Sequence, residues 1–134
     1  MTLLVVDASV VAAWLFDDEN DPLAARAFAL LGHADAIVPQ LWHIEMRNIL
    51  LVAHRRGRLT AAVLRSRLAA LPDLPLLTDH EPDMTAAFAL AEHHGLSFYD
   101  ALYLELAQRS SAVLASLDRR LCRAATAEGI TVLE

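Results

Sequence analysis

The sequence predicts an α/β fold in which helices cover both faces of a mainly parallel central sheet, a three-layer α/β/α sandwich. Short apolar runs alternate with longer segments of helical periodicity along the 134 residues. The first run, residues 3–6, is apolar at every position, as expected of a strand buried on both faces. Strands that alternate with helices form parallel sheets, because a parallel pair needs a long crossover connection.

The remaining elements follow from periodicity and from residues that start or stop helices. Pro22 suits a first helical turn with Asp21 as its cap, while Gly57 and Gly95 suit helix ends. In chain order we expect a helix over 10–16, an acidic loop over 17–21, a helix over 22–32, a strand over 36–38 stopped by Pro39, a helix over 41–56, a helix from Thr60 to before Pro72, a strand over 74–77, a helix over 82–94, a helix over 99–109, a strand over 112–117, a helix over 119–128 and a strand over 130–133.

Size and composition indicate one compact domain over residues 1–134, with 56% apolar residues to fill its core. No apolar run reaches the roughly 18 residues that a membrane span needs, so no membrane contact is expected. The N-terminal apolar run stops at Asp7 without a basic segment before it, unlike a signal peptide. The one cysteine, Cys122, cannot form an internal disulfide, which favours the cytoplasm.

The net charge of −6 is unfavourable for broad capture of nucleic-acid backbones. There are 17 acidic residues against 11 basic ones, and every basic residue is arginine. Two features offset this balance. The arginines cluster within residues 55–58, 65–67 and 119–123, and a cation bound among the acids would reverse the local sign.

Four acids are placed where a parallel α/β sheet forms its binding sites, beyond the carboxyl ends of the strands. Asp7 and Asp118 each follow a predicted strand, Asp100 opens a predicted helix, and Glu45 lies near the start of another. Several carboxylates in one cleft repel each other and need a compensating cation. Ligands that are all oxygen suit Mg²⁺, or Mn²⁺, better than zinc.

Helix capping is the competing explanation for three of these acids. Asp7, Asp100 and Asp118 each precede or open a helix, and aspartate is among the preferred capping residues. Glu45 differs, because its neighbours four residues away are apolar and cannot pair with it. Asn48 lies three residues further on and shares its helix face, as in a polar pocket.

The four acids stand in segments that resemble the motifs of the PIN-domain family, over essentially the whole chain. Residues 5–9 (VVDAS) resemble its opening motif, an aspartate after the first strand followed by a hydroxyl residue. Residues 39–50, with Glu45, resemble the second motif; residues 98–103 (FYDALY) the third; and residues 114–121 (LASLDRRL) the fourth. The absence of an added module makes VapC-type toxins the most similar branch.

This resemblance implies a metal-dependent endoribonuclease, the toxin of a type II toxin–antitoxin pair. Asp7 and Asp100 would be the main Mg²⁺ ligands, with Glu45 and Asp118 completing a four-carboxylate site directly or through water. The metal would activate a water for hydrolysis of an RNA phosphodiester bond. The attacking water would be oriented by Asp118 or Glu45, a choice that the sequence leaves open.

The resemblance also implies further site residues and partners. Ser9 and Ser116 would hydrogen-bond phosphate or a ligand carboxylate, and Asn48 would complete the polar pocket. The expected partners are RNA, a cognate antitoxin protein that covers the cleft, and a second copy of the chain in a homodimer. We expect the histidines to lie outside the site.

Other functions fit the sequence less well. Haloacid-dehalogenase phosphatases and phospho-receiver domains use a lysine beside their aspartate, and this chain has none. A P-loop NTPase is excluded, because no Gly-rich stretch ends in Gly-Lys. The remaining alternative is a non-catalytic PIN-like module that binds a protein, with its acids acting only as helix caps.

Overall fold

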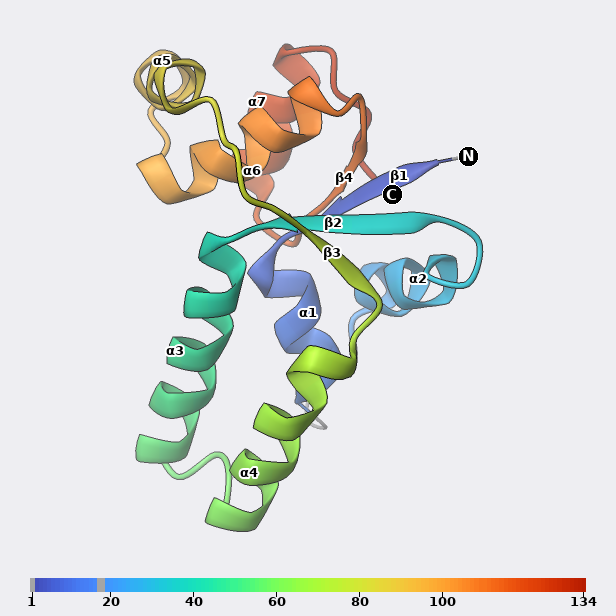
Figure 1. The fold of residues 1–134 in the computed structure, drawn as a ribbon, viewed down its shortest axis with the longest axis vertical. Helices are drawn as coiled ribbons and strands as arrows, with labels where there is room; N and C mark the ends of the chain where they lie inside the picture. The colour runs from blue at the N-terminus through green and yellow to red at the C-terminus, as the bar shows by residue number, and fades with distance from the viewer. Residues whose placement is uncertain (1, 17–18) are drawn as a thin grey trace.

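Four parallel strands form a sheet in the order β3-β2-β1-β4 (Figure 1). The computed structural model describes residues 2–16 and 19–134, so part of the expected acidic loop, residues 17–18, lies outside the described residues. The strands are β1 (Leu3–Val6), β2 (Asp35–Pro39), β3 (Leu76–Asp79) and β4 (Val113–Ala115). The predicted α/β fold with its parallel sheet is therefore confirmed.

Helices cover both faces of this sheet and complete the three layers (Figure 1). One face carries α5 (Met84–His94), α6 (Phe98–Arg109) and α7 (Arg119–Ala127), and the other carries α1 (Ala8–Leu15), α2 (Pro22–Leu30), α3 (Leu41–Arg55) and α4 (Ala61–Ala70). The α3–α4 hairpin extends away from the sheet (Figure 1), and α4 has no buried residue.

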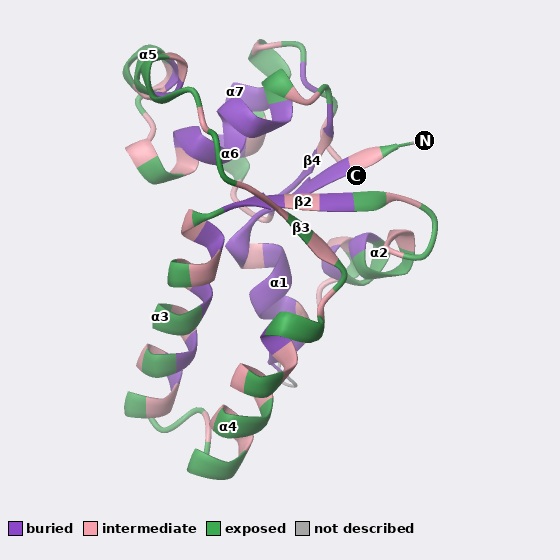
Figure 2. Ribbon diagram, in the orientation of Figure 1, coloured by how far each residue is buried: buried purple, intermediate pink, exposed green. Residues whose placement is uncertain are grey.

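The core is densest where α6 crosses the sheet. Residues 101–107 of α6 are buried without interruption, and the helix contacts β1, β2 and β4 (Figure 2). Opposite it, Leu4, Val5 and Val6 of β1 are at most 1% exposed, as predicted for a strand covered on both faces. The buried part of α6 begins directly after its first turn, which carries the partly exposed Asp100.

The third strand lies two residues further along the chain than predicted. A 3₁₀ turn, Leu71–Asp73, follows α4, and Leu74 remains in this turn because its N–H donates to the Leu71 carbonyl at 3.3 Å. Pairing then begins at Leu76, which stands beside Ala36 of β2. The apolar run at 74–77 alone could not locate a register that depends on β2.

The last predicted strand, 130–133, is reduced to an isolated parallel bridge between Val132 and Leu114. The predicted strand 112–117 is also shorter, because the chain leaves the sheet after Ala115 to begin the turn before α7. The helix expected to open at Pro82 begins at Met84, where the Asp83 carboxylate accepts from the Ala86 N–H at 2.9 Å. These differences shorten elements without changing the fold.

Within the part of the chain that the structure describes, none of the helices combines the length and apolarity required to span a membrane.

Candidate active site at the carboxyl ends of the strands

Asp7 lies at the junction of β1 and α1, with 6% of its surface exposed. Its N–H still belongs to the sheet and donates to the Ala115 carbonyl of β4 at 3.1 Å. Its carboxylate caps α1, because Oδ1 accepts from the Val10 N–H at 3.2 Å. The strand therefore delivers a buried carboxylate to the carboxyl edge of the sheet.

Two serines hold both oxygens of this carboxylate. The Ser9 hydroxyl donates to Asp7 Oδ1 at 2.5 Å, and the Ser116 hydroxyl donates to Oδ2. Each serine oxygen also accepts a backbone N–H, from Leu117 at 3.1 Å and from Asp118 at 3.0 Å respectively. Of the two partners expected for these serines, phosphate and a ligand carboxylate, the structure shows the carboxylate.

Asp118 and Asp100 occupy different positions on their helices. Asp118 caps α7, since its Oδ1 accepts from the N–H groups of Arg120 and Leu121 at 2.9 and 3.3 Å. Asp100 does not cap α6. Ser97 holds that position, and its hydroxyl oxygen accepts the Asp100 N–H at 3.1 Å. The capping explanation is therefore right for Asp7 and Asp118 and wrong for Asp100, which is half-buried without that role.

Glu45 projects from α3 toward α6, where the buried Tyr103 hydroxyl donates to Glu45 Oε1 at 2.5 Å. Tyr103 is not among the site residues expected from the sequence. A signal was present, because Tyr103 is three residues after Asp100 and such residues share a helix face. This hydrogen bond joins two helices and orients one of the candidate ligands.

Asn48 is not brought into this group of acids. It is exposed and lines a shallow pocket of α3 with Val52 and Arg56. Its predicted place on the same helix face as Glu45 did not bring it to the acids, because α3 leaves the sheet and its later turns run down the α3–α4 hairpin.

Electrostatic coupling shows that the four acids share one region. Burial raises the pKa of Asp7 above its ordinary value, and the Asp100 charge raises it further, while its hydrogen bonds lower it. The pKa of Glu45 is raised by burial first and then by Asp100 and Asp7. The pKa of Asp100 is raised by burial and then by Asp118, and Arg120 partly opposes this shift. Folding thus gathers carboxylates that destabilise one another's charged forms.

Such a group fits a hard dication, whose charge would offset the repulsion. Among the described residues, one group of three candidate ligands has its atoms within 4.8 Å of one another, and it does not include these acids. The arrangement therefore fits an ion that contacts one or two of the carboxylates and reaches the others through water. Mg²⁺ binds in this way, since it retains several of its waters.

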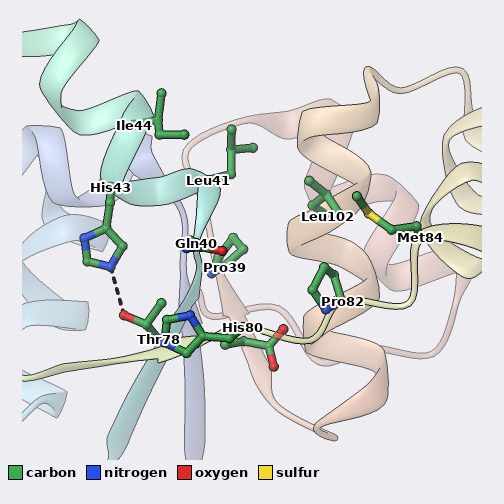
Figure 3. Close-up of a pocket in the computed structure, with 11 residues that line it drawn as sticks. Pro39, Gln40, Leu41, His43, Ile44, Thr78, His80, Pro82, Met84 and Leu102 are labelled. Atoms are coloured by element: carbon green, nitrogen blue, oxygen red, sulfur yellow. Dashed lines mark hydrogen bonds between the residues drawn. The ribbon is translucent and has the colours of Figure 1, made fainter.

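An apolar groove of about 470 Å³ lies between the start of α3, the end of β3 and α6 (Figure 3). Its walls include Ile44, next to Glu45, and Leu102, two residues after Asp100. A hydrogen bond of 2.8 Å between His43 and Thr78 closes one side of it (Figure 3). The groove offers apolar contacts from residues other than the four acids.

A sequence model of the PIN domain matches residues 4–127. The chain is 35% identical over 121 residues to ribonuclease VapC3 of Pyrobaculum aerophilum, covering 88% of this chain and 91% of that protein. The chain therefore belongs to the PIN-domain family, and its relatives place it in the VapC-type branch.

Solved structures agree with this assignment. The crystal structure of PAE2754 from Pyrobaculum aerophilum is similar with a TM-score of 0.73 and 27% identity, covering 98% of this chain and 83% of that one. VapBC2 from Rickettsia felis, bound to a DNA fragment from its promoter, has a TM-score of 0.69 at 12% identity, covering 98% of this chain and 96% of that one. The second similarity concerns the fold alone.

Proposed function

We propose that this chain is a Mg²⁺-dependent endoribonuclease and the toxin of a type II toxin–antitoxin pair. The observation that carries the proposal is the buried Asp7 carboxylate, held at both oxygens and coupled to Glu45 and Asp100. Its named relatives are ribonucleases, which supports RNA as the substrate.

The contacts of each acid indicate the role that it would have in the site. Asp7 has little freedom to move, because two serines and a helix N-terminus hold it, so it would be the fixed ligand of the ion. Asp100 would be the second ligand, because it has no capping role to maintain. When bound, the ion would lower the pKa of a water and neutralise charge on the phosphate.

Glu45 and Asp118 would act around that ion. The pKa of Tyr103 is raised by burial and by the Glu45 charge, so its hydroxyl stays protonated and donates to Glu45. Glu45 keeps its second oxygen available to accept a proton from water. The charge of Asp118 acts on Asp100, and one Asp118 oxygen is held by backbone N–H groups.

The partner we propose is an antitoxin protein that covers the acidic site with a basic side chain. The charge supports this, because three carboxylates with raised pKa values attract a cation of any kind. The similar VapBC2 structure is that of a protein complex bound to DNA, which supports the same class of partner. The proposed location is the cytoplasm.

Cleavage of a mixed RNA pool, with and without EDTA, tests the proposal. We expect cleavage with Mg²⁺ or Mn²⁺, none in EDTA, and a loss of about 100-fold or more in Asp100→Asn, the order seen when one key electrostatic group is removed from an active site. Asp100→Asn is a sharper test than Asp7→Asn, because Asp7 also caps a helix and accepts from two serines.

The matched control is Asp83→Asn, which changes a capping aspartate of α5 that is not among the groups shifting the pKa of Asp7, Glu45 or Asp100. It should cleave like the wild type. Full activity in Asp100→Asn, or equal cleavage in EDTA, would contradict the metal mechanism, whereas no cleavage with either ion would favour the non-catalytic binding module.

A further inference from the structure

Two histidines and a glutamate come together at the carboxyl ends of α5 and α7, outside the acid site. His93 and His94 form the last turn of α5, and Glu128 directly follows α7. One ligand atom from each lies within 4.8 Å of the other two. Within the described ranges 2–16 and 19–134, no other group of three or more His, Cys, Asp or Glu residues meets this closely.

The three side chains are oriented by contacts from three helices. His94 Nε2 and Glu128 Oε2 lie 2.7 Å apart, and the Gln108 amide of α6 donates to Glu128 Oε1 at 3.1 Å. The His93 and His94 rings meet edge to face at 4.6 Å. His94 and Glu128 are only 11% and 24% exposed, whereas His93 is open to solvent. His94 and Glu128 therefore form a partly enclosed pair, and His93 lies on the side of the cluster that is open to solvent.

We propose that His93, His94 and Glu128 form a binding site for a borderline transition-metal dication, with Zn²⁺ as the ion it fits best. Two imidazole nitrogens and one carboxylate oxygen, with water as the fourth ligand, make a common tetrahedral zinc set. This chemistry differs from that of the acid site, whose ligands are all oxygen and suit Mg²⁺.

The positions of the ligands on their helices favour a cation as well. His93 and His94 lie at the carboxyl end of α5, and Glu128 is the residue that ends α7. Helix carboxyl ends carry partial negative charge, so both ends attract a dication. Gln108 would hold the ligand carboxylate from behind, as second partners of metal ligands commonly do.

Bound zinc would join α5 to α7 beside the active region without entering the reaction. The Arg120 guanidinium lies 3.3 Å from the position that a Cβ would take at Gly95, the residue after His94. Arg120 in turn acts on the charge of Asp100. The ion would thus link the end of α5, which leads into α6 with Asp100, to the end of α7, whose first turn is capped by Asp118. This inference does not depend on the proposed ribonuclease function.

Calorimetric titration of the purified chain with ZnCl₂, in buffer that contains Mg²⁺, tests the site. We expect one zinc per chain in the wild type, and binding at least about 10-fold weaker in His93→Ala and Glu128→Gln. His33→Ala, an exposed histidine in the turn after α2, is the matched control and should bind like the wild type. Asp100→Asn should also keep zinc binding, because the acid site is separate.

A second measurement separates ligand loss from misfolding. ZnCl₂ should raise the melting temperature of the wild type but not that of His93→Ala, while the two should melt alike without zinc, because His93 is exposed. Unchanged zinc affinity in both His93→Ala and Glu128→Gln overturns the proposal. Loss of zinc binding in Asp100→Asn alone overturns it too, because the ion would then occupy the acid site.

Discussion

At the scale of single residues, the four acids differ in how many hydrogen bonds their carboxylate oxygens already accept. Asp7 accepts from Ser9, Ser116 and Val10, and Asp118 accepts from two backbone N–H groups. Asp100 and Glu45 have fewer such donors, and their pKa values are raised by burial and then by neighbouring carboxylates. Residues that are held firmly suit the fixed part of a site, while residues with free oxygens suit ligands and proton acceptors.

The raised pKa values predict how stability changes with pH in the metal-free protein. A carboxyl group whose folded pKa is raised favours the folded state below its ordinary pKa, and this contribution is lost as pH rises through the folded value. The ordinary values are 3.8 for aspartate and 4.5 for glutamate. In EDTA, the stability of Asp100→Asn relative to the wild type should therefore increase as pH rises from about 4.

Urea denaturation of both proteins across this range measures the difference. Mg²⁺ at neutral pH should reduce it, since the ion stabilises the wild type more than the variant. Asp83→Asn, the control outside the acids, should show no such increase. A difference between Asp100→Asn and the wild type that stays constant with pH would mean that the four charges do not act on one another.

Substitution of Tyr103 tests whether Glu45 takes part in the reaction. Tyr103→Phe removes the hydrogen bond that lowers the pKa of Glu45, so that pKa should rise and the acidic limb of the cleavage profile should move to higher pH. Stability should fall by about 1 kcal/mol, as for a typical hydrogen bond. Tyr99→Phe, an exposed tyrosine on the same helix, is the control. A pH profile that does not move in Tyr103→Phe would remove Glu45 from the reaction.

At the scale of elements, α6 controls the site because it carries Asp100 and Tyr103 on one face and crosses three strands. Its first turn depends on Ser97, whose hydroxyl oxygen accepts the Asp100 N–H. A cap at this position therefore acts on the site as well as on the stability of the helix.

Ser97→Ala should lower stability by about 1 kcal/mol and reduce cleavage, and Ser97→Asp should restore the cap. Thr60→Ala is the matched comparison, since Thr60 caps α4 through the Val63 N–H at 3.2 Å and α4 has no buried residue. It should leave cleavage unchanged. Thermal melts and the RNA assay compare Ser97→Ala with Thr60→Ala. Equal cleavage activity in these two variants would mean that the cap of α6 does not affect the site.

At the scale of the whole molecule, the apolar groove of Figure 3 is a feature that the fold leaves open. Ile44 and Met84 on its walls are 68% and 57% exposed, and Phe88 and Tyr99 on the neighbouring helices are also exposed. Exposed apolar side chains that gather around one groove, as Ile44 and Met84 do, are typical of an interface.

We therefore predict a homodimer that buries this groove. Light scattering at micromolar concentration should give twice the chain mass of 14.7 kDa for the wild type, and Ile44→Glu should give the monomer mass. Phe28→Ser, an equally apolar and exposed position on α2, is the control and should stay dimeric. A monomeric wild type would contradict the prediction.

Local patterns account for the part of this molecule that the sequence alone determined. Four apolar runs, the helix periods and the capping residues predict the parallel α/β fold, because side-chain spacing and backbone hydrogen bonds are local properties. The same patterns put Asp7, Asp100 and Asp118 at strand ends and helix starts, where a parallel sheet forms its sites.

Tertiary structure alone decided which side chains meet. The Ser116 hydroxyl reaches Asp7 across 109 residues, Tyr103 reaches Glu45 across 58, and His94 reaches Glu128 across 34. The register of β3 likewise depends on β2 and not on its own apolar run. Such contacts depend on how helices rotate and where strands pair, and these are set when distant parts of the core pack together, so no local spacing encodes them.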